Sequence, residues 1–320
     1  MNMIAETLTE TDVEQIRVDA KRIAAEAYPS QAAAARDAGI AESTFAAFCS
    51  DTYAGDNAKV AAKAKAWLSS RAERAKTAAT IPVAPSFQMT PTAAKIIPAL
   101  QWAQVAPDYV PIIGAPGLGK TRTLEHYAAC NANVFLVTME PAWSSANAML
   151  AALCQGMGLD ERSSTKYSSA IRAKVKGLQA LIIVDEAQFL STVALDQLRV
   201  IHDTAKVGVV LCGNRQIHTR LYGRGDEANA QLFSRAGMKF HQYQPLAGDI
   251  CGMVAAWGVT DKAEVAFLKT VGRKPGALRN VDKVMKLASM LAVGGGEPRG
   301  LKHIRAAWEQ IDVNLTVTAG

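Results

Sequence analysis

The chain has 320 residues, room for two or three domains, and its hydrophobic content of 49% excludes a wholly disordered protein. Its 35 basic and 29 acidic residues leave a net charge of +6 at pH 7, a modest excess that suits a polyanionic partner without requiring one. The five cysteines are scattered and form no Cys-x-x-Cys pair, which predicts a reduced, cytoplasmic protein. The sequence shows no signal-peptide pattern and no long apolar run, so no membrane partner is expected.

Residues 1–76 are predicted to form a helical N-terminal domain. Apolar spacing predicts a helix over 8–27, Ser30 can cap a second helix that stops at Gly39, and a third helix follows a short turn. The pattern is similar to a repressor-type helix-turn-helix, whose second helix enters the DNA major groove. That helix contains no Lys or Arg here, so the commonest specific contact to guanine is excluded. The alternative is a helical domain that docks a protein partner, with the Lys-rich helix over 59–76 as a solvated face.

Residues 77–91 are rich in Ala, Pro, Ser and Thr, which is typical of a linker between domains. We therefore expect a second domain to begin at residue 92, and its nucleotide-binding core to extend to residue 244.

Function is predicted most directly by Gly114–Thr121, which matches G-x-x-x-x-G-K-[ST] between an apolar strand and a helix. In that context backbone N–H groups and the helix N-terminus bind phosphate. Lys120 is predicted to reach the β- and γ-phosphates of ATP, and Thr121 to hold Mg²⁺. The alternative is a glycine-rich turn that matches by chance. The remaining residues of the predicted cradle are Gly114, Ala115, Pro116, Gly117, Leu118 and Gly119.

Two further strands end in polar residues. The apolar run over 180–184 ends in Asp185 and Glu186, and the run over 207–213 ends in Asn214. Adjacent acids can divide the work of hydrolysis: Asp185 binds Mg²⁺ through water, and Glu186 orients and deprotonates the attacking water. A buried strand with a capping acid is the alternative for the first run.

In this order the motifs resemble the AAA+ ATPase family. The resemblance implies a doubly wound parallel α/β core, Asn214 as the sensor 1 residue, Arg235 in Leu232–Arg235 as an arginine finger, and Arg279 in Lys274–Arg279 as sensor 2 of a helical lid over 245–320. An arginine finger acts on the nucleotide of the next subunit, so it also implies a ring or a filament.

Several stretches also resemble the family of Mu-type transposition B proteins, among them Ile183–Ala187, Gly208–Asn214 and Leu232–Arg235. This resemblance implies an ATP-bound helical filament on double-stranded DNA that delivers target DNA to a DDE transposase, with slow, DNA-stimulated hydrolysis. The chain departs from the family in its uncharged recognition helix, so binding without sequence specificity is expected.

A predicted loop after Asn214 concentrates positive charge at Arg215, Arg220 and Arg224. Such residues can contact DNA phosphates without reading bases. An ordinary basic surface loop is the alternative. The competing functions are a helicase-loader-type or secretion-type ATPase, and an ATP-dependent transcriptional regulator that reads an operator.

Overall fold

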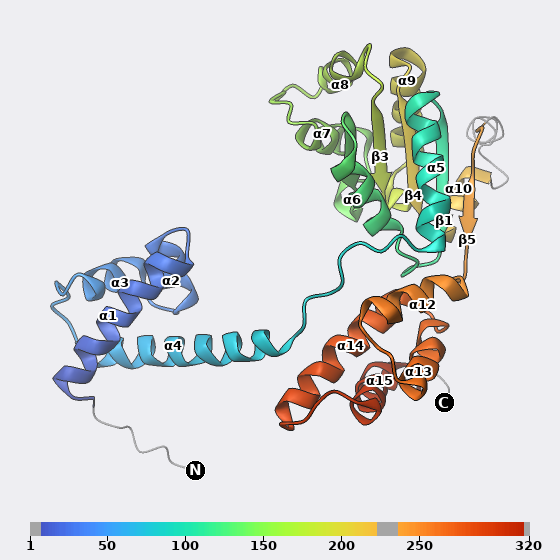
Figure 1. Ribbon diagram of the computed structural model, residues 1–320. Coiled ribbons are helices and arrows are strands. Elements are labelled where there is room, and N and C mark those ends of the chain that lie inside the picture. Colours follow the sequence, from blue (N-terminus) through green and yellow to red (C-terminus); the bar gives the residue numbers. More distant parts are fainter. Residues whose placement is uncertain (1–7, 223–235, 317–320) are drawn as a thin grey trace. The chain divides into compact units, whose positions relative to one another are not determined.

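The computed structural model describes residues 8–222 and 236–316. The chain divides into two compact units, Met1–Pro82 and Val83–Gly320 (Figure 1). Among the described residues, no helix combines the length and the apolar content needed to cross a bilayer.

The N-terminal unit is all helical, as the sequence predicts. Its helices are α1 (Glu10–Ala27), α2 (Gln31–Asp37), α3 (Glu42–Cys49) and α4 (Asn57–Thr80). Ser30 caps α2 by accepting a hydrogen bond from Ala33 N–H at 3.2 Å, and Gly39 supplies the left-handed turn (φ 63°) that precedes α3. The helix α4 continues past the predicted end at residue 76, because residues 72–79 are mostly strong helix formers.

Small residues let these helices approach closely around an aromatic centre. Alanines of α1, α2 and α4 are buried, and Phe45, Phe48 and Trp67 fill the space between the helices. The rings of Phe45 and Trp67 meet edge to face at 5.8 Å. This packing produces the helix-turn-helix arrangement of α2 and α3.

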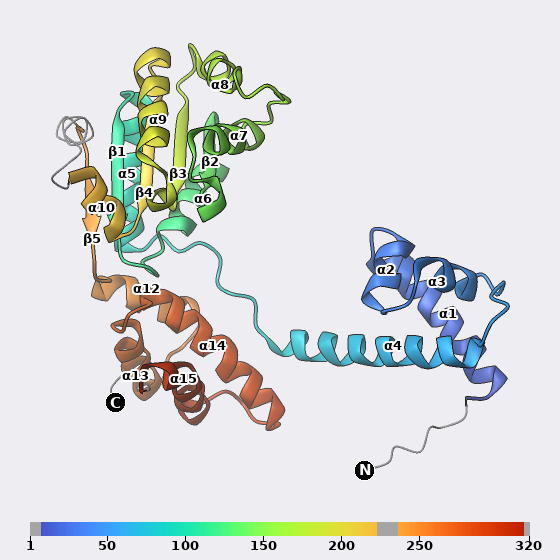
Figure 2. The same cartoon turned by 180° about the vertical axis from the view of Figure 1, so that it is seen from behind.

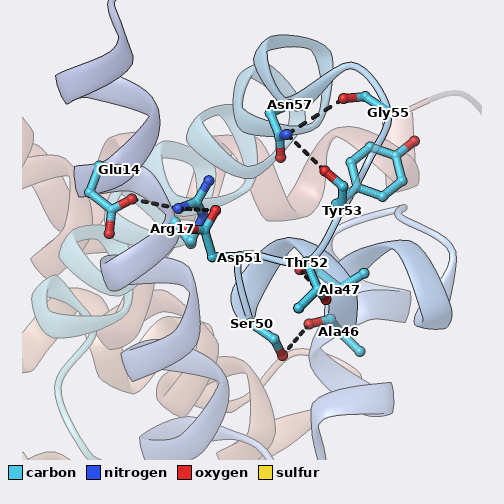
Figure 3. A network of polar contacts seen from close by, with 10 residues as sticks. All are labelled: Glu14, Arg17, Ala46, Ala47, Ser50, Asp51, Thr52, Tyr53, Gly55 and Asn57. Carbon is cyan, nitrogen blue, oxygen red and sulfur yellow. Dashed lines mark hydrogen bonds and ion pairs between the residues drawn. The ribbon is translucent and has the colours of Figure 1, made fainter.

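A polar network holds the turn between α3 and α4 (Figure 3). The Arg17 side chain, largely buried on α1, donates to Glu14 and forms an ion pair with Asp51 at 2.6 Å. Ser50 donates to the Ala46 carbonyl at 2.8 Å. Arg17 is thus neutralised by Glu14 on its own helix and by Asp51 in the turn after α3.

The second unit contains a parallel sheet of five strands in the order β2-β3-β4-β1-β5. The strands are β1 (Tyr109–Gly114), β2 (Val134–Thr138), β3 (Leu181–Asp185), β4 (Gly208–Gly213) and β5 (Phe240–Gln242). All residues of β1, β3 and β4 are buried, as expected for a sheet covered on both faces. Because every pairing is parallel, the carboxyl ends of the strands meet at one edge.

Helices cover both faces of this sheet, which confirms the doubly wound α/β fold (Figure 2). One face packs against α5 (Pro91–Val105) and α6 (Lys120–Cys130). The other packs against α7 (Ala146–Gly156), α8 (Tyr167–Val175) and α9 (Thr192–Ala205). Two short 3₁₀ segments, η1 (Pro141–Trp143) and η2 (Ala187–Phe189), follow β2 and β3.

The structure corrects the loop predicted after Asn214, because residues Arg215–Tyr222 form the helix α10. The Asn214 side-chain oxygen accepts the Gln216 N–H at 2.8 Å, as an N-cap residue does, and Ile217 is fully buried. A capped first turn with an apolar anchor therefore continues as a helix.

Four helices follow the sheet as a lid: α12 (Ala247–Ala256), α13 (Lys262–Gly272), α14 (Ala277–Gly294) and α15 (Leu301–Thr316). Their apolar faces pack on one another around Leu268, Val281, Met285 and Ile304, all fully buried. The lid has its own hydrophobic core, separate from the two cores of the sheet.

Candidate active site

The glycine-rich loop leaves β1 and enters α6 at the carboxyl edge of the sheet. Gly117 and Gly119 have φ values of 82° and 87°, in the left-handed region that favours glycine. The Lys120 ammonium group donates to the carbonyls of Gly114 and Ala115, both at 2.9 Å. The first turn of α6 thus begins inside the loop, with the lysine folded back along it.

The strand β5 fixes the start of this loop. Ala115 N–H donates to the Gln242 carbonyl at 3.0 Å, and a Cβ atom on Gly114 would lie 2.7 Å from that same oxygen. Glycine is needed at position 114 because the backbone of β5 approaches so closely. The sequence did not predict the strand β5, although this strand positions the predicted phosphate cradle.

The two predicted Mg²⁺ ligands lie side by side. The Thr121 hydroxyl donates to Asp185 Oδ2 at 2.6 Å, and the Asp185 side chain is only 1% exposed. Burial raises the pKa of the neighbouring Cys212 thiol well above its usual value, and the negative charge of Asp185 raises it further. A hydroxyl and a carboxylate in contact fit Mg²⁺, which prefers hard oxygen ligands and completes its shell with phosphate and water.

Glu186 follows in an unusual backbone conformation. Its φ of 53° is left-handed, which is uncommon for a residue other than glycine, and its N–H donates to Asp185 Oδ1 at 2.9 Å. The chain turns sharply here, so the side chains of two adjacent residues leave β3 in different directions: Asp185 is buried against Thr121, and Glu186 lines a cavity.

That cavity has a volume of about 540 Å³ and gathers motifs far apart in the sequence. It is lined by residues of the phosphate loop together with Glu186 after β3, Asn214 after β4 and Arg279 on α14. Predicted loop residues on its wall are Pro116, Gly117, Gly119, Lys120 and Thr121. The carboxyl ends of three strands, a loop and the lid therefore meet at one site.

The lid reaches this site by a direct backbone contact. Leu278 N–H donates to the Gly117 carbonyl at 3.1 Å, and a Cβ atom on Gly117 would lie 2.0 Å from the Gly276 carbonyl oxygen. The glycine at position 117 thus permits the close approach of the α14 N-terminus. This contact brings Arg279, in the first turn of α14, to the cavity.

Of the remaining predicted arginines, the structure describes the side chain of Arg215 alone, and Arg215 does not line the cavity. Arg215 is exposed at the start of α10, with its guanidinium carbon 5.8 Å from the centre of the Tyr243 ring. Arg220 lies on α10 with its side chain outside the described part of the chain, and Arg224 and Arg235 lie outside the described residues.

Sequence reasoning missed a wall formed by residues 84–88, part of the predicted linker. In this segment the Phe87 ring stacks on His126 of α6, with ring centres 3.9 Å apart and planes 9° from parallel. An aromatic residue within an otherwise Pro- and Ala-rich stretch was the one available signal. On the lid side, Asp282 and Lys286 also line the cavity, joined by an ion pair of 2.7 Å.

Two family profiles match the chain. The one described as "Mu B transposition protein, C terminal" covers residues 234–311, and the one described as "AAA domain" covers residues 109–221. Between them they span the sheet from β1 to α10 and most of the lid.

Full-length relatives are similar over most of the chain. The "ATP-dependent target DNA activator B" of Escherichia phage Mu is 29% identical over 287 residues, which are 89% of this chain and 91% of the relative. The "Mu-like prophage FluMu DNA transposition protein B" of Haemophilus influenzae is 33% identical over 255 residues, 78% of this chain and 88% of the relative. Among solved structures, a Walker-type ATPase of Pyrococcus abyssi is 11% identical with a TM-score of 0.48, covering 75% of this chain and 78% of its own.

Proposed function

The chain belongs to the family of Mu B transposition proteins, and from that premise we propose that it is an AAA+ ATPase whose nucleotide state controls its binding to target DNA. The observation that carries the proposal is the single cavity that joins the phosphate loop, Glu186, Asn214 and Arg279. ATP and Mg²⁺ are the proposed ligands of this cavity.

We assign the chemistry to the residues on the cavity wall. Lys120 neutralises the β- and γ-phosphates, and Arg279 adds a second positive charge from the lid. A water oxygen attacks the γ-phosphorus while the bond to the β,γ-bridging oxygen breaks, and the proton released by water passes to Glu186, leaving ADP and phosphate. Asn214 orients the water. When bound, Mg²⁺ would be held by Thr121 and, through water, by Asp185, and would supply charge neutralisation on the phosphate oxygens.

Assembly on DNA extends the same proposal. Arg235 is proposed to reach the nucleotide of a neighbouring subunit, so that ATP favours a filament or ring and hydrolysis releases it. Arg215, Arg220 and Arg224 are the proposed contacts to DNA phosphates. The lack of Lys and Arg in α3 supports binding without a preferred sequence.

A transposase is the proposed protein partner. The phage Mu relative is named a target DNA activator, and we propose the same role for this chain: presenting DNA to a DDE transposase and stimulating it. We propose that it does so in the cytoplasm of a bacterial host, where ATP and DNA are both present.

The test is electron microscopy and sedimentation with plasmid DNA of arbitrary sequence, comparing ATP, ADP and no nucleotide. Wild-type protein should coat DNA with ATP alone, and Lys120→Ala should fail to bind ATP or DNA. Lys95→Ala, an exposed lysine on α5, is the matched control and should behave as wild type. Glu186→Gln should bind ATP but persist on DNA, because hydrolysis no longer releases it.

Other outcomes would redirect the proposal. Closed rings that bind no plasmid would favour a loader-type ATPase, and binding confined to one DNA sequence would favour an operator-reading regulator. Tight ATP binding by Lys120→Ala would contradict the assignment of the phosphate loop itself.

A further inference from the structure

A buried glutamine joins two of the residues assigned to hydrolysis. Gln188, on η2 just after β3, is 9% exposed. Its Nε2 donates to Glu186 Oε2, and its Oε1 accepts the backbone N–H of Asn214 at 3.3 Å. The Gln188 amide therefore bridges the ends of two neighbouring strands, β3 and β4.

The chemistry of the amide sets the direction of this bridge. A carboxylate only accepts hydrogen bonds and a backbone N–H only donates, so just one orientation of the Gln188 amide satisfies both. A carboxylate, a hydroxyl or an apolar side chain of similar size would lose at least one of the two contacts in that arrangement.

The strand β4 leaves space for the bridge. A Cβ atom on Gly213 would lie 2.7 Å from Gln188 Oε1 and 2.9 Å from the Ile217 side chain. The next residue, Asn214, uses its own side-chain oxygen to cap α10. The end of β4 is thus fixed on one side by α10 and on the other by the Gln188 amide.

We propose that Gln188 is a positioning residue for ATP hydrolysis: it holds the Glu186 carboxylate in a fixed position relative to Asn214. The inference rests on the proposed ATPase function. Glu186 stands on a sharp left-handed turn, and its side chain has three rotatable bonds, so its backbone alone does not fix the carboxylate. A hydrogen bond from a buried amide restricts those rotations, as a precisely oriented catalytic group requires.

The test uses three single variants of the full chain. Gln188→Met keeps the volume and removes both hydrogen bonds. Gln188→Glu keeps an acceptor for Asn214 N–H and removes the donor to Glu186. Gln197→Met, a partly exposed glutamine on α9, is the matched control.

Both Gln188 variants should lower the kcat for ATP roughly 10- to 100-fold, the scale of loss for a misplaced catalytic group. Their KM and their affinity for ATP should stay within about twofold of wild type, because the bridge does not touch the phosphate loop. Gln197→Met should keep the wild-type kcat. If Gln188→Met does not fold, the comparison with wild type uses Gln188→Glu, which still accepts the Asn214 N–H.

A double-mutant cycle with Glu186→Gln separates positioning from general structural damage. If Gln188 acts through the carboxylate, Gln188→Met should change the residual single-turnover rate by less than about twofold in the Glu186→Gln background. An equal fold-loss in both backgrounds would overturn the proposal, as would a wild-type kcat in Gln188→Glu. Should Glu186→Gln itself hydrolyse ATP at the wild-type rate, the assigned role of Glu186 fails, and the role of Gln188 with it.

Discussion

One of the contacts between the sheet and the lid depends on a buried carboxylate, and its replacement offers a quantitative test of the structure. Asp249, at the start of α12, is 0% exposed. Its Oδ1 accepts Thr92 N–H at 2.8 Å, and its Oδ2 accepts the Thr92 hydroxyl at 2.5 Å and Leu246 N–H at 2.8 Å. One side chain thus secures the first turn of α5 and the first turn of α12.

Asp249→Asn keeps the shape but has a single acceptor oxygen. Whichever way the amide turns, its NH₂ group faces a backbone N–H, either of Thr92 or of Leu246, and at least one buried donor loses its partner. That loss costs about 1–3 kcal/mol. For a unit of this size, each kcal/mol lowers the Tm by roughly 2–4 °C, so the expected fall is about 2–12 °C.

Scanning calorimetry of the full chain measures this shift, and Asp261→Asn is the matched control. Asp261 caps α13 at the exposed surface by accepting Ala263 N–H and Glu264 N–H, both at 2.9 Å. Asn caps helices as well as Asp does, so the control should change the free energy of unfolding by only a few tenths of a kcal/mol. A Tm for Asp249→Asn within about 1 °C of wild type would refute the argument, since it implies that no buried donor was left unpaired.

Three further outcomes follow from the site. Thr121→Val should raise the Mg²⁺ concentration that hydrolysis requires, because Asp185 loses its hydroxyl neighbour; an unchanged Mg²⁺ titration would argue against that pairing. Gly117→Ala should weaken ATP binding measured by calorimetry, because its Cβ would lie 2.0 Å from the Gly276 oxygen and push the lid away. Burial and a raised pKa keep the Cys212 thiol protonated, so a thiolate-specific reagent at pH 8 should modify Cys212 only after unfolding, whereas the exposed Cys130 and Cys251 react in the folded protein; rapid labelling of Cys212 itself, located by peptide mapping, would contradict its burial.

Sequence alone predicted those parts of the site whose chemistry is local. The phosphate loop is contiguous, so its strand, glycines and Lys120 could be identified from spacing. Asp185, Glu186 and Asn214 each end an apolar strand, and parallel strands bring their carboxyl ends to one edge. The cavity gathers Glu186 and Asn214 beside the loop, where that reasoning expects them.

What the sequence did not predict depends on contacts between distant segments. The strand β5 has only three residues, too few to show an alternating pattern, and it exists through its pairing with β1. Gln188 looks like an ordinary polar residue until the fold brings Asn214, 26 positions later, against its amide. Residues 84–88 carry the composition of a linker, and it is tertiary contacts, such as the stacking of Phe87 on His126, that hold this segment at the cavity.

The lid is tied to the sheet at two points that both lead to the phosphate loop. Leu278 N–H reaches the Gly117 carbonyl directly. The second route begins at Asp249 on the lid, whose carboxylate accepts the Thr92 hydroxyl. The Thr92 hydroxyl in turn accepts Gln242 Nε2–H at 2.6 Å. The backbone carbonyl of Gln242 accepts Ala115 N–H in the phosphate loop.

A rotation of the lid about an axis that does not pass through both points would strain the hydrogen bonds at one of them. Displacing the loop at Gly117, where the phosphates are proposed to bind, therefore acts on the same lid that carries Arg279. This arrangement offers the proposed ATP switch a physical route, because two hydrogen-bonded contacts connect the lid to the loop that is proposed to bind the phosphates.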